Sequence, residues 1–396
     1  MNIARDGSVV TGDVSKQGMT YKDTGVDYDA MDPVKRFAQL AGRETAVFLE
    51  RFGFKEVEWS RGESCYLIAT PFGYIGFVVE GLGTKNKVAD SLREALYMLA
   101  IQIHRLTGKT FYDQVGQCNV AMAVNDLITL GALPLVYGQY LGIGASDWLK
   151  DGQRARQLIE GTKNACILAR CSWGCGETPT LKGIIFPDTA DLAGATVGFA
   201  RKDQLINPAN IRPGDAIIFA ESSGIHANGL TLARGISDKL PDGYLTKLSD
   251  GRTYGETLLD PTEIYVGLVE DCLKAGVDIH YAVNITGHGW RKLMRATQPF
   301  AYIIETLPTQ LPIFDFIQKH GPVDDREAYG NLNMGAGFAL YVPEEDVAKV
   351  LAIGNPSMSP DSDSVFRAGH IEASDIKKVV IKPKGLEYLG STLGVR

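Results

Sequence analysis

Strand-like apolar runs that pass directly into glycine-rich polar loops occur in both halves of this 396-residue chain. In the first half the run FVV leads into EGLGTK at residues 80–85, and in the second DAIIFA leads into ESSGIHANG at residues 221–229. Helical periodicity follows each loop. This alternation of strands and helices predicts a mixed α/β (α+β) fold with a sheet in each half.

The length of the chain predicts two domains, because a single hydrophobic core rarely serves so many residues. The turn-rich stretch INPANIRPGD at residues 206–215 separates the two halves. We therefore expect an N-terminal domain over residues 1–205 and a C-terminal domain over residues 206–396. Within the first domain, Ser91 and Glu94 form a capping-box pattern that predicts a helix from about residue 91.

Composition excludes several classes of protein. The formal net charge is −7, so there is no global basic field that would attract nucleic acid. The start, MNIARDGSVV, has no apolar run typical of a signal peptide, and no stretch reaches the roughly 18–20 apolar residues of a membrane span. Cys171 and Cys175 do not match a CxxC pair. These features predict a cytoplasmic protein with neither a nucleic-acid nor a membrane partner.

Four segments of the first half combine glycine and lysine with carboxylate or amide groups. In chain order they are YKDTGVD at residues 21–27, EGLGTK at 80–85, VNDL with GALPL at 124–135, and CGET at 175–178. They offer a backbone that can approach phosphate closely, cations for its oxygens and oxygen ligands for its magnesium ion. The chain has neither a GxxxxGK[ST] P-loop nor a GxGxxG fingerprint. The combination predicts an enzyme that uses ATP with Mg²⁺.

Each segment also has an ordinary structural interpretation when it is taken alone. Lys22 is then a surface lysine near the end of the chain, and EGLGTK is a tight turn with surface charges. Asn125 and Asp126 fall in an otherwise apolar helix, where adjacent polar groups need hydrogen-bond partners or a cation. In the functional interpretation, Lys22 belongs to a flexible arm that folds over bound nucleotide.

The loop ESSGIHANG brings four side chains with ligand-binding chemistry together in the second half: Ser222, Ser223, His226 and Asn228. Loops on a rigid scaffold often carry function, so contacts with a substrate are expected here. The structural alternative for His226 is a helix-capping or surface histidine. A Ser–His hydrolase is disfavoured, because neither serine lies in a GxSxG elbow.

Three more motifs complete a pattern that runs from Tyr21 to about Val350: DPTEIYV at 260–266, ITGHG at 285–289 and NMGAG at 333–337. With the segments above, this pattern resembles the aminoimidazole ribonucleotide synthetase family, also called the phosphoribosylformylglycinamidine cyclo-ligase family, which is part of a wider ATP-using superfamily. The resemblance implies conversion of formylglycinamidine ribonucleotide to aminoimidazole ribonucleotide in purine biosynthesis. It also implies a homodimer that pairs through its N-terminal sheets, with the ATP sites near that interface.

The resemblance also implies roles for particular residues. Catalytic roles are expected for Lys22, Asp27 and His226. ATP is expected to contact Lys22, Gly81, Gly83, Thr84, Lys85, Asn125, Asp126, Gly176, Glu177 and Thr178. Mg²⁺ is expected at Glu80, Asn125 and Asp126, and the small-molecule substrate at Ser222, Ser223, His226, Asn228, Thr286 and His288.

The chain departs from the family pattern where ligands are expected. Glu80 replaces an aspartate, His288 replaces a glycine, and further changes fall at Cys118, Gln139, Cys175, Thr180 and Leu293. Loss of two carboxylates, at Cys118 and Gln139, is expected to weaken or rearrange magnesium binding. Two alternatives therefore stay open: a diverged ATP-dependent kinase or amide-activating enzyme with another small-molecule acceptor, and a nucleotide-binding protein that has lost turnover.

Overall fold

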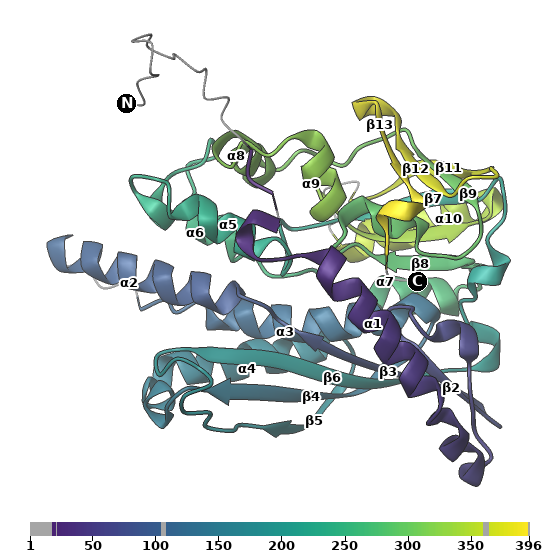
Figure 1. The fold of residues 1–396 in the computed structure, drawn as a ribbon, viewed down its shortest axis with the longest axis horizontal. Coiled ribbons are helices and arrows are strands. Elements are labelled where there is room, and N and C mark those ends of the chain that lie inside the picture. The colour runs from purple at the N-terminus through teal and green to yellow at the C-terminus, as the bar shows by residue number, and fades with distance from the viewer. Residues whose placement is uncertain (1–17, 21, 104–107, 359–363, 395–396) are drawn as a thin grey trace, which may run out of the picture.

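The computed structural model describes residues 18–20, 22–103, 108–358 and 364–394. Its two sheets, one of six strands and one of seven, lie in separate halves of the chain and are flanked by helices (Figure 1). The predicted mixed α/β fold is confirmed. None of the described helices combines the length and the apolar character needed to cross a membrane.

The N-terminal sheet has the strand order β1-β2-β3-β6-β4-β5, antiparallel except for the parallel pair β4–β5. Its strands are β1 (Lys55–Glu56), β2 (Tyr66–Thr70), β3 (Gly73–Gly81), β4 (Leu133–Ile143), β5 (Ser172–Glu177) and β6 (Ala190–Ala200). Three helices belong to this half: α2 (Lys85–Ile103), α3 (Tyr112–Leu127) and α4 (Gly152–Leu168). Helix α3 packs on β3 and β6 and against α4, so one face of the sheet is covered.

Burial alternates along β3 because successive side chains of a strand point to opposite faces. Val78 is 5% exposed and faces the helices, whereas Phe77 and Val79 on the other face are 43% and 61% exposed. Strand β5, at the edge of this sheet, is exposed along its whole length. The face of the sheet away from the helices is therefore apolar and uncovered.

The C-terminal sheet has the order β13-β12-β9-β11-β7-β10-β8, antiparallel except for the parallel pair β9–β12. Its strands are β7 (Ala216–Glu221), β8 (Tyr281–Asn284), β9 (Phe300–Ile304), β10 (Ala336–Val342), β11 (Val365–Ala373), β12 (Lys378–Ile381) and β13 (Leu386–Leu389). The helices of this half are α5 (Leu230–Ser237), α6 (Tyr254–Leu258), α7 (Val266–Lys274), α8 (Pro312–His320), α9 (Asp325–Asn331) and α10 (Val347–Met358). Every residue of β8 and β10 is buried, although β8 is an edge strand of this sheet.

An N-terminal arm precedes the first sheet and crosses the front of the molecule (Figure 1). It contains the 3₁₀ turn η1 (Lys22–Thr24), helix α1 (Tyr28–Arg43) and the 3₁₀ segment η2 (Ala46–Phe52); a further 3₁₀ turn, η3 (Glu58–Ser60), lies between β1 and β2. Asp27 caps α1 by accepting a hydrogen bond from the Asp29 amide, which satisfies one of the free N–H groups at the helix start. Turn η1 contacts α5 of the C-terminal half. Tyr21 lies outside the described residues.

The predicted start of α2 is wrong. The helix begins at Lys85, directly after the glycine-rich turn, and Ser91 lies inside it. The turn itself redirects the chain, since Gly83 has a φ of +75°, and the Ser91–Glu94 pattern is therefore not at a helix end. Beyond Gly369, the C-terminal segment completes the second sheet with β12 and β13.

Candidate active site

The register of the N-terminal sheet brings two of the predicted ATP-binding segments into line. Gly81 pairs with Ala193, Ala193 with Tyr140, and Tyr140 with Glu177. The two ends of this row, Gly81 and Glu177, are three strand spacings apart, a distance of about 14 Å. Gly81 and Glu177 are both exposed. EGLGTK and CGET thus border the same stretch of sheet, although they lie far apart in the sequence.

The neighbouring residue, Glu80, points to the other face of the sheet and approaches Asp126 of α3. Asp126 is 5% exposed, and its Oδ1 accepts a hydrogen bond of 2.7 Å from Asn284 Nδ2 on β8. Burial, followed by the nearby Asp126 carboxylate, raises the pKa of Glu80 to about 8. The structure therefore brings together the two acidic residues that were predicted to bind metal.

Three further charged residues complete what we call the charged cluster: Glu63, Glu80, Asp126, Lys292 and Arg295. Lys292, in the 3₁₀ segment η9 (Gly289–Met294), donates a hydrogen bond of 2.6 Å to Thr286 Oγ1. Burial lowers the pKa of Lys292, while the Asp126, Glu80 and Glu63 carboxylates act in the opposite direction. The cluster joins the two halves of the chain, because its acids come from the first and its cations from the second.

Arg295 and Glu63 of the charged cluster are held by hydrogen bonds and an ion pair. The Arg295 guanidinium donates to the Gly62 carbonyl at 2.8 Å and to Ser64 Oγ at 3.0 Å, and lies 3.6 Å from the Glu63 carboxylate. Tyr281 of β8 donates to the same carboxylate at 2.8 Å. Sequence reasoning missed Glu63, Lys292 and Arg295, because isolated charges outside any motif carry no signal until the fold brings them together.

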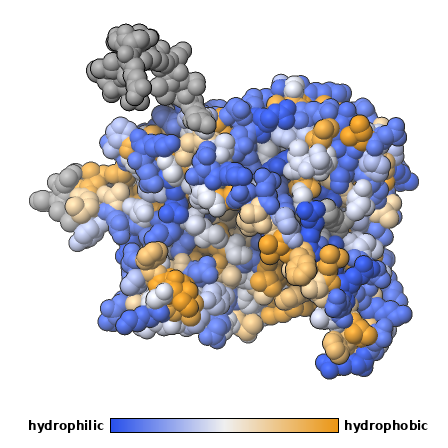
Figure 2. All heavy atoms as spheres, viewed as in Figure 1, coloured by the Kyte–Doolittle hydropathy of each residue, from blue (hydrophilic) through white to orange (hydrophobic). Residues whose placement is uncertain are grey.

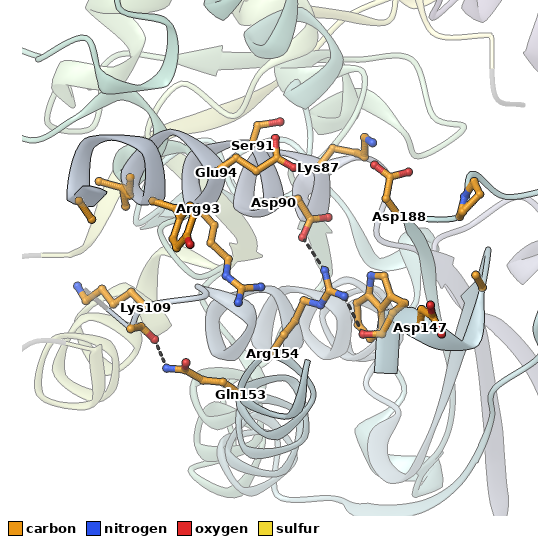
Figure 3. A pocket seen from close by; sticks show the side chains of 17 residues that line it. Lys87, Asp90, Ser91, Arg93, Glu94, Lys109, Asp147, Gln153, Arg154 and Asp188 are labelled. Carbon is orange, nitrogen blue, oxygen red and sulfur yellow. Dashed lines mark hydrogen bonds and ion pairs between the residues drawn. The ribbon is translucent and has the colours of Figure 1, made fainter. Parts of the chain in front are cut away.

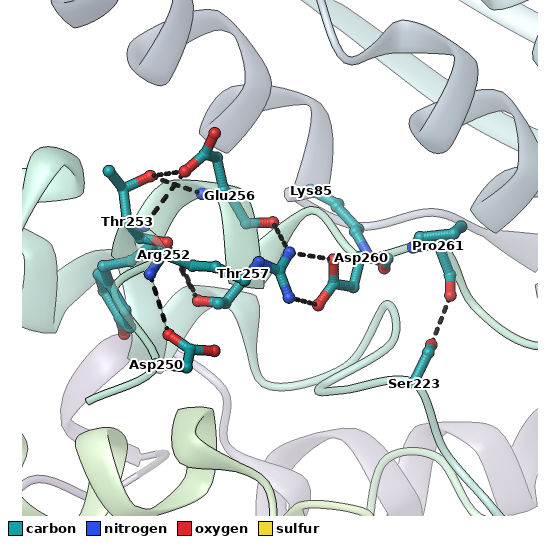
Figure 4. Close-up of polar contacts among 10 residues, drawn as sticks. Lys85, Ser223, Asp250, Arg252, Thr253, Glu256, Thr257, Asp260 and Pro261 are labelled. Atoms are coloured by element: carbon teal, nitrogen blue, oxygen red, sulfur yellow. Dashed lines mark hydrogen bonds and ion pairs between the residues drawn. The ribbon is translucent and has the colours of Figure 1, made fainter. Parts of the chain in front are cut away.

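Lys85 has a different role from the predicted contact with phosphate. Its side chain is fully buried, and Nζ donates to the carbonyl oxygens of His226 at 2.8 Å and Asp260 at 2.6 Å. Figure 4 shows this ammonium beside Asp260, whose carboxylate is held separately by Arg252. Because α2 begins at Lys85, the side chain points into loops of the C-terminal half. Its ammonium ties the two halves together.

The Asn125 side chain also makes its hydrogen bonds within the protein. Its Nδ2 donates to the Glu263 carbonyl at 2.7 Å, and its Oδ1 accepts from the Tyr265 amide at 3.0 Å. Both ends of the amide therefore hold the DPTEIYV segment against α3. This corrects the predicted contacts of Asn125 with ATP and Mg²⁺, because the side chain is turned toward residues 263–265 and both ends of its amide bond to that backbone.

Lys22 and Asp27 lie together on the surface of the arm. Lys22 Nζ is 3.1 Å from an Asp27 carboxylate oxygen, and the Lys22 side chain is 67% exposed. This ion pair raises the pKa of Lys22. Figure 1 places the arm's η1 turn beside α5 in the upper half of the view and strand β5 at the lower edge. One copy of the chain therefore does not bring Lys22 next to Gly176, Glu177 and Thr178.

The polar side chains of the ESSGIHANG loop make hydrogen bonds within the protein, both inside the loop and to the DPTEIYV and NMGAG segments. Ser222 Oγ donates to Asn333 Oδ1 at 3.0 Å, and Ser223 Oγ donates to the Pro261 carbonyl at 2.5 Å. His226 is 4% exposed with a left-handed φ of +58°, and its Nε2 accepts from the Ser223 amide at 3.3 Å. Burial lowers the pKa of His226 to about 3, so the ring is neutral. This corrects the predicted catalytic and substrate contacts of His226: the imidazole lies inside the loop.

The ITGHG loop meets both the ESSGIHANG loop and the arm. Asn228 Oδ1 accepts from the Gly287 amide at 3.1 Å. His288 stacks on Tyr28 of α1 with ring centroids 3.8 Å apart. The Tyr28 hydroxyl approaches Gly287 so closely that a Cβ there would lie 2.6 Å from it, which accounts for the glycine. Of the predicted substrate-binding residues, Asn228, Thr286 and His288 therefore converge between the arm and the charged cluster.

A cavity of about 790 Å³ lies elsewhere, between α2 and the start of α4 (Figure 3). None of the predicted site residues lines it. Its central cation, Arg154, is paired with Asp90 at 3.4 Å and donates to the Trp148 carbonyl at 2.7 Å. Arg93 is paired with Asp151 in the same wall. Arg154 and Arg93 are thus neutralised by Asp90 and Asp151 and have no need of a bound anion. For this reason we do not place the reaction in this cavity.

Replacing Glu80 with glutamine is expected to change how stability depends on pH. The pKa of Glu80 is higher in the folded chain than in the unfolded one, so its contribution to stability is full below about pH 4.5 and is lost as pH rises through about 8. The neutral glutamine avoids this loss. In metal-free buffer, the Tm of Glu80→Gln should therefore rise relative to wild type between about pH 5 and 9. Parallel Tm profiles would contradict the burial of this carboxyl group; Glu44→Gln, on the surface, is the control.

Comparison with known proteins relates most of the chain to one family. Residues 93–200 match the AIR synthase related protein, N-terminal domain, and residues 212–381 match the AIR synthase related protein, C-terminal domain. A phosphoribosylformylglycinamidine cyclo-ligase of Methanocaldococcus jannaschii is 35% identical over 341 residues, which cover 85% of this chain and 89% of that protein. The cyclo-ligase of Carboxydothermus hydrogenoformans is 33% identical, over 84% of this chain and 91% of its own.

Solved structures share the fold at much lower identity. A chain of the HypE–HypF complex superposes with a TM-score of 0.55 at 15% identity, covering 87% of this chain and 97% of that chain. AaThiL, complexed with AMPPCP and TMP, gives a TM-score of 0.53 at 14% identity, covering 83% and 91%. The resemblance inferred from the sequence motifs is confirmed: the chain belongs to the AIR synthase family, together with the phosphoribosylformylglycinamidine cyclo-ligases.

Proposed function

We propose that this protein is a phosphoribosylformylglycinamidine cyclo-ligase, which uses ATP to convert formylglycinamidine ribonucleotide to aminoimidazole ribonucleotide in purine biosynthesis. The observation that carries the proposal is the buried carboxyl pair of Glu80 and Asp126 beside the glycine-rich turn at the end of β3. The pair occurs in a chain that is 35% identical to a protein named phosphoribosylformylglycinamidine cyclo-ligase, and the match covers 89% of that protein. We place the enzyme in the cytoplasm.

In this reaction the formyl amide oxygen takes the γ-phosphoryl group of ATP, an amidine nitrogen closes the ring, and phosphate leaves. Catalysis of such a transfer consists mainly of positioning two reactants and of balancing charge on the phosphoryl oxygens. The two ends of the row, Gly81 and Glu177, suit the nucleotide, because they are exposed where the glycine-rich turn and the CGET segment leave the sheet. We assign Gly81, Gly83, Thr84, Gly176, Glu177 and Thr178 to ATP.

The residues present also fit a magnesium ion. The described residues contain no group of three or more His, Cys, Asp or Glu that would hold a metal by itself. Mg²⁺ in nucleotide sites is commonly held by one or two carboxylates and completed by phosphate oxygens and water. Glu80 and Asp126 are such a pair, and their mutual repulsion favours a bound cation. A bound Mg²⁺ would neutralise negative charge on the phosphates.

We assign the acceptor to the region where the arm meets the ITGHG loop. Asn228, Thr286 and His288 converge there, and Ser222 and Ser223 shape the neighbouring loop. Lys22 and Asp27 lie at the start of the same arm and remain assigned to the phosphates and to catalysis. The stack of Tyr28 on His288 holds the arm to this loop, which excludes water from the space between them.

We also propose a homodimer that pairs through the uncovered face of the N-terminal sheet. Phe77 and Val79 of β3 are exposed on that face, together with Leu135 of β4. Figure 2 shows apolar side chains gathered where α1 crosses β3, and α1 contributes Val34, Phe37 and Leu40, each more than 60% exposed. Contiguous apolar surface of this kind marks an interface in most soluble proteins.

Replacing Val79 with glutamate is expected to convert this dimer to a monomer. The substitution places a charge at the centre of an apolar interface, where it would be desolvated without a partner. The measurement is molar mass by light scattering during gel filtration, with circular dichroism to confirm folding. Ile376→Glu is the matched control, because Ile376 is 60% exposed in the turn between β11 and β12. A Val79→Glu protein that stays dimeric would place the interface elsewhere.

The function itself is tested by turnover of the purified protein with ATP, Mg²⁺ and formylglycinamidine ribonucleotide, following ADP and aminoimidazole ribonucleotide in parallel. Equal amounts of both products are expected. ADP release without the aminoimidazole would assign the protein to a related ATP-dependent reaction with another acceptor. ATP binding with neither product would make it a nucleotide-binding protein without turnover.

A further inference from the structure

Lys292 is a buried ammonium whose hydrogen-bonding capacity is only partly used. Its side chain is 6% exposed, and its Nζ donates to one neutral acceptor, Thr286 Oγ1. An ammonium group has three donors, so two remain without a partner in the part of the chain that the structure describes. Burying a charge is costly unless it is paired and hydrogen-bonded, and Thr286 alone does not meet that requirement.

The two buried lysines of this region differ in this respect. Lys85 Nζ donates to two carbonyl oxygens and holds two loops of the C-terminal half. Lys292 belongs to that cluster, where its charge interacts with the Asp126, Glu80 and Glu63 carboxylates without a contact ion pair among the described residues. Lys292 is therefore the ammonium that a group bound beside Glu80 and Asp126 would meet.

The ligand chemistry that fits this arrangement is a phosphoryl group. Its oxygens are strong acceptors that would take the unused donors, and charge-assisted hydrogen bonds of this kind are short and strong. A lysine next to the carboxylates that hold the metal ion is a recurring arrangement in phosphoryl-transfer enzymes. The Thr286 hydrogen bond holds Nζ in place, since the ammonium would otherwise be free to turn with its side chain.

We propose that Lys292 is a catalytic residue whose ammonium contacts the γ-phosphoryl group as it passes from ATP to the amide oxygen; this rests on the cyclo-ligase function proposed above. In that step the bond from phosphorus to the ADP oxygen breaks, its electron pair leaves with ADP, and a bond from phosphorus to the amide oxygen forms. The ring nitrogen then forms a C–N bond as the C–O bond to phosphate breaks, and one proton passes to water. Lys292 keeps its proton throughout.

The test compares Lys292→Met, Lys292→Arg and Thr286→Val with wild type in two assays. In steady-state turnover, Lys292→Met should lower kcat about 10²-fold with little change in KM for ATP, because the contact is made to the transferring group. Lys292→Arg should recover part of the loss, and Thr286→Val should give an intermediate kcat, because it keeps the charge and removes its anchor. Lys349→Met, at a lysine paired with Asp346 away from the cluster, is the control.

The second assay measures binding of ADP alone and of ADP with aluminium fluoride and Mg²⁺ by calorimetry, without acceptor. Lys292→Met should bind ADP normally and lose most of the added affinity for the fluoroaluminate complex, which mimics the transferring phosphoryl group. Equal losses for both ligands, or a kcat within about twofold of wild type, would overturn the proposal. If Lys292→Met does not fold by circular dichroism, Thr286→Val gives the decision by the binding assay alone, because that assay contains no acceptor and Thr286 is also assigned to the acceptor site.

The binding assay also separates this proposal from the function on which it rests. Wild-type protein that binds ADP with fluoroaluminate in a Lys292-dependent way, but forms no aminoimidazole ribonucleotide, would retain the lysine's role and refute the cyclo-ligase. Wild-type protein that forms the product while Lys292→Met is fully active would retain the cyclo-ligase and refute the lysine's role. Absence of both fluoroaluminate binding and product would refute both.

Discussion

Lys85→Met is expected to lower the free energy of unfolding by about 3 kcal/mol, since each of two buried carbonyl groups loses its donor at a cost of roughly 1–3 kcal/mol. The carbonyls belong to His226 and Asp260, in loops of the C-terminal half, and Lys85 begins a helix of the N-terminal half. Methionine fills most of the same volume, so the effect isolates the ammonium. Urea unfolding followed by both circular dichroism and fluorescence measures the change.

The same variant decides between two roles for this residue. If Lys85 serves the fold, Lys85→Met that remains folded at low temperature should bind ATP with nearly wild-type affinity. If Lys85 instead contacts phosphate, as the GTK motif suggested, stability would be almost unchanged and ATP affinity would fall. Lys87→Met is the matched control, because Lys87 is only two residues further along the same helix and is not fully buried.

Lys22→Ala is expected to lower kcat/KM for ATP by roughly 10³-fold, the effect of removing a cation that meets the transferring phosphates. Thermal unfolding should not change, because the side chain is exposed and its contacts are surface ion pairs with Asp27 and Asp29. Steady-state kinetics with varied ATP, together with Tm by differential scanning fluorimetry, gives both quantities. Lys85→Met and Lys22→Ala should therefore show opposite patterns of stability and activity.

Lys35→Ala is the control for the arm, because Lys35 lies on α1 and pairs with Asp32 at 3.7 Å. It should keep its activity. Lys22→Arg should retain part of the activity, since it preserves the charge. An unchanged kcat/KM in Lys22→Ala would remove Lys22 from the site and leave the arm with a structural role through Tyr28 and His288.

Patterns within single segments predicted the fold class well. The apolar runs before EGLGTK and ESSGIHANG are β3 and β7, and the glycine-rich turns follow them as expected. Local patterns failed at the start of α2, where the capping box at Ser91 lies inside the helix. A capping motif specifies a helix end only if the preceding residues cannot continue the helix, and here residues 85–90 can. The boundary near residue 205 stays a prediction.

The chemical roles of single side chains were harder to predict, because each depends on residues far away in the sequence. Asn125 was expected to face a ligand, and its amide instead bonds to the backbone of residues 263 and 265. His226 was expected to face a substrate and is buried, with its ring beside Tyr265 and bonded to the Ser223 amide. Polar groups within an apolar segment signal that partners exist. They do not identify whether the partner is a ligand or the chain itself.

The sequence alone therefore determined the mixed α/β fold, the family and the segments that border the site. The fold class follows from periodicity and turn residues, which act over short distances. The family follows from the order of the motifs, which can be read directly from the sequence. Only the tertiary structure decided which charges meet. Glu63, Glu80, Asp126 and the pair Lys292 and Arg295 come from four separate segments, and their contacts arise when the two halves of the chain pack together, as α3 and β8 do. Electrostatic interactions depend on distance in space, so a buried ammonium such as Lys292 acquires its role only in the folded chain.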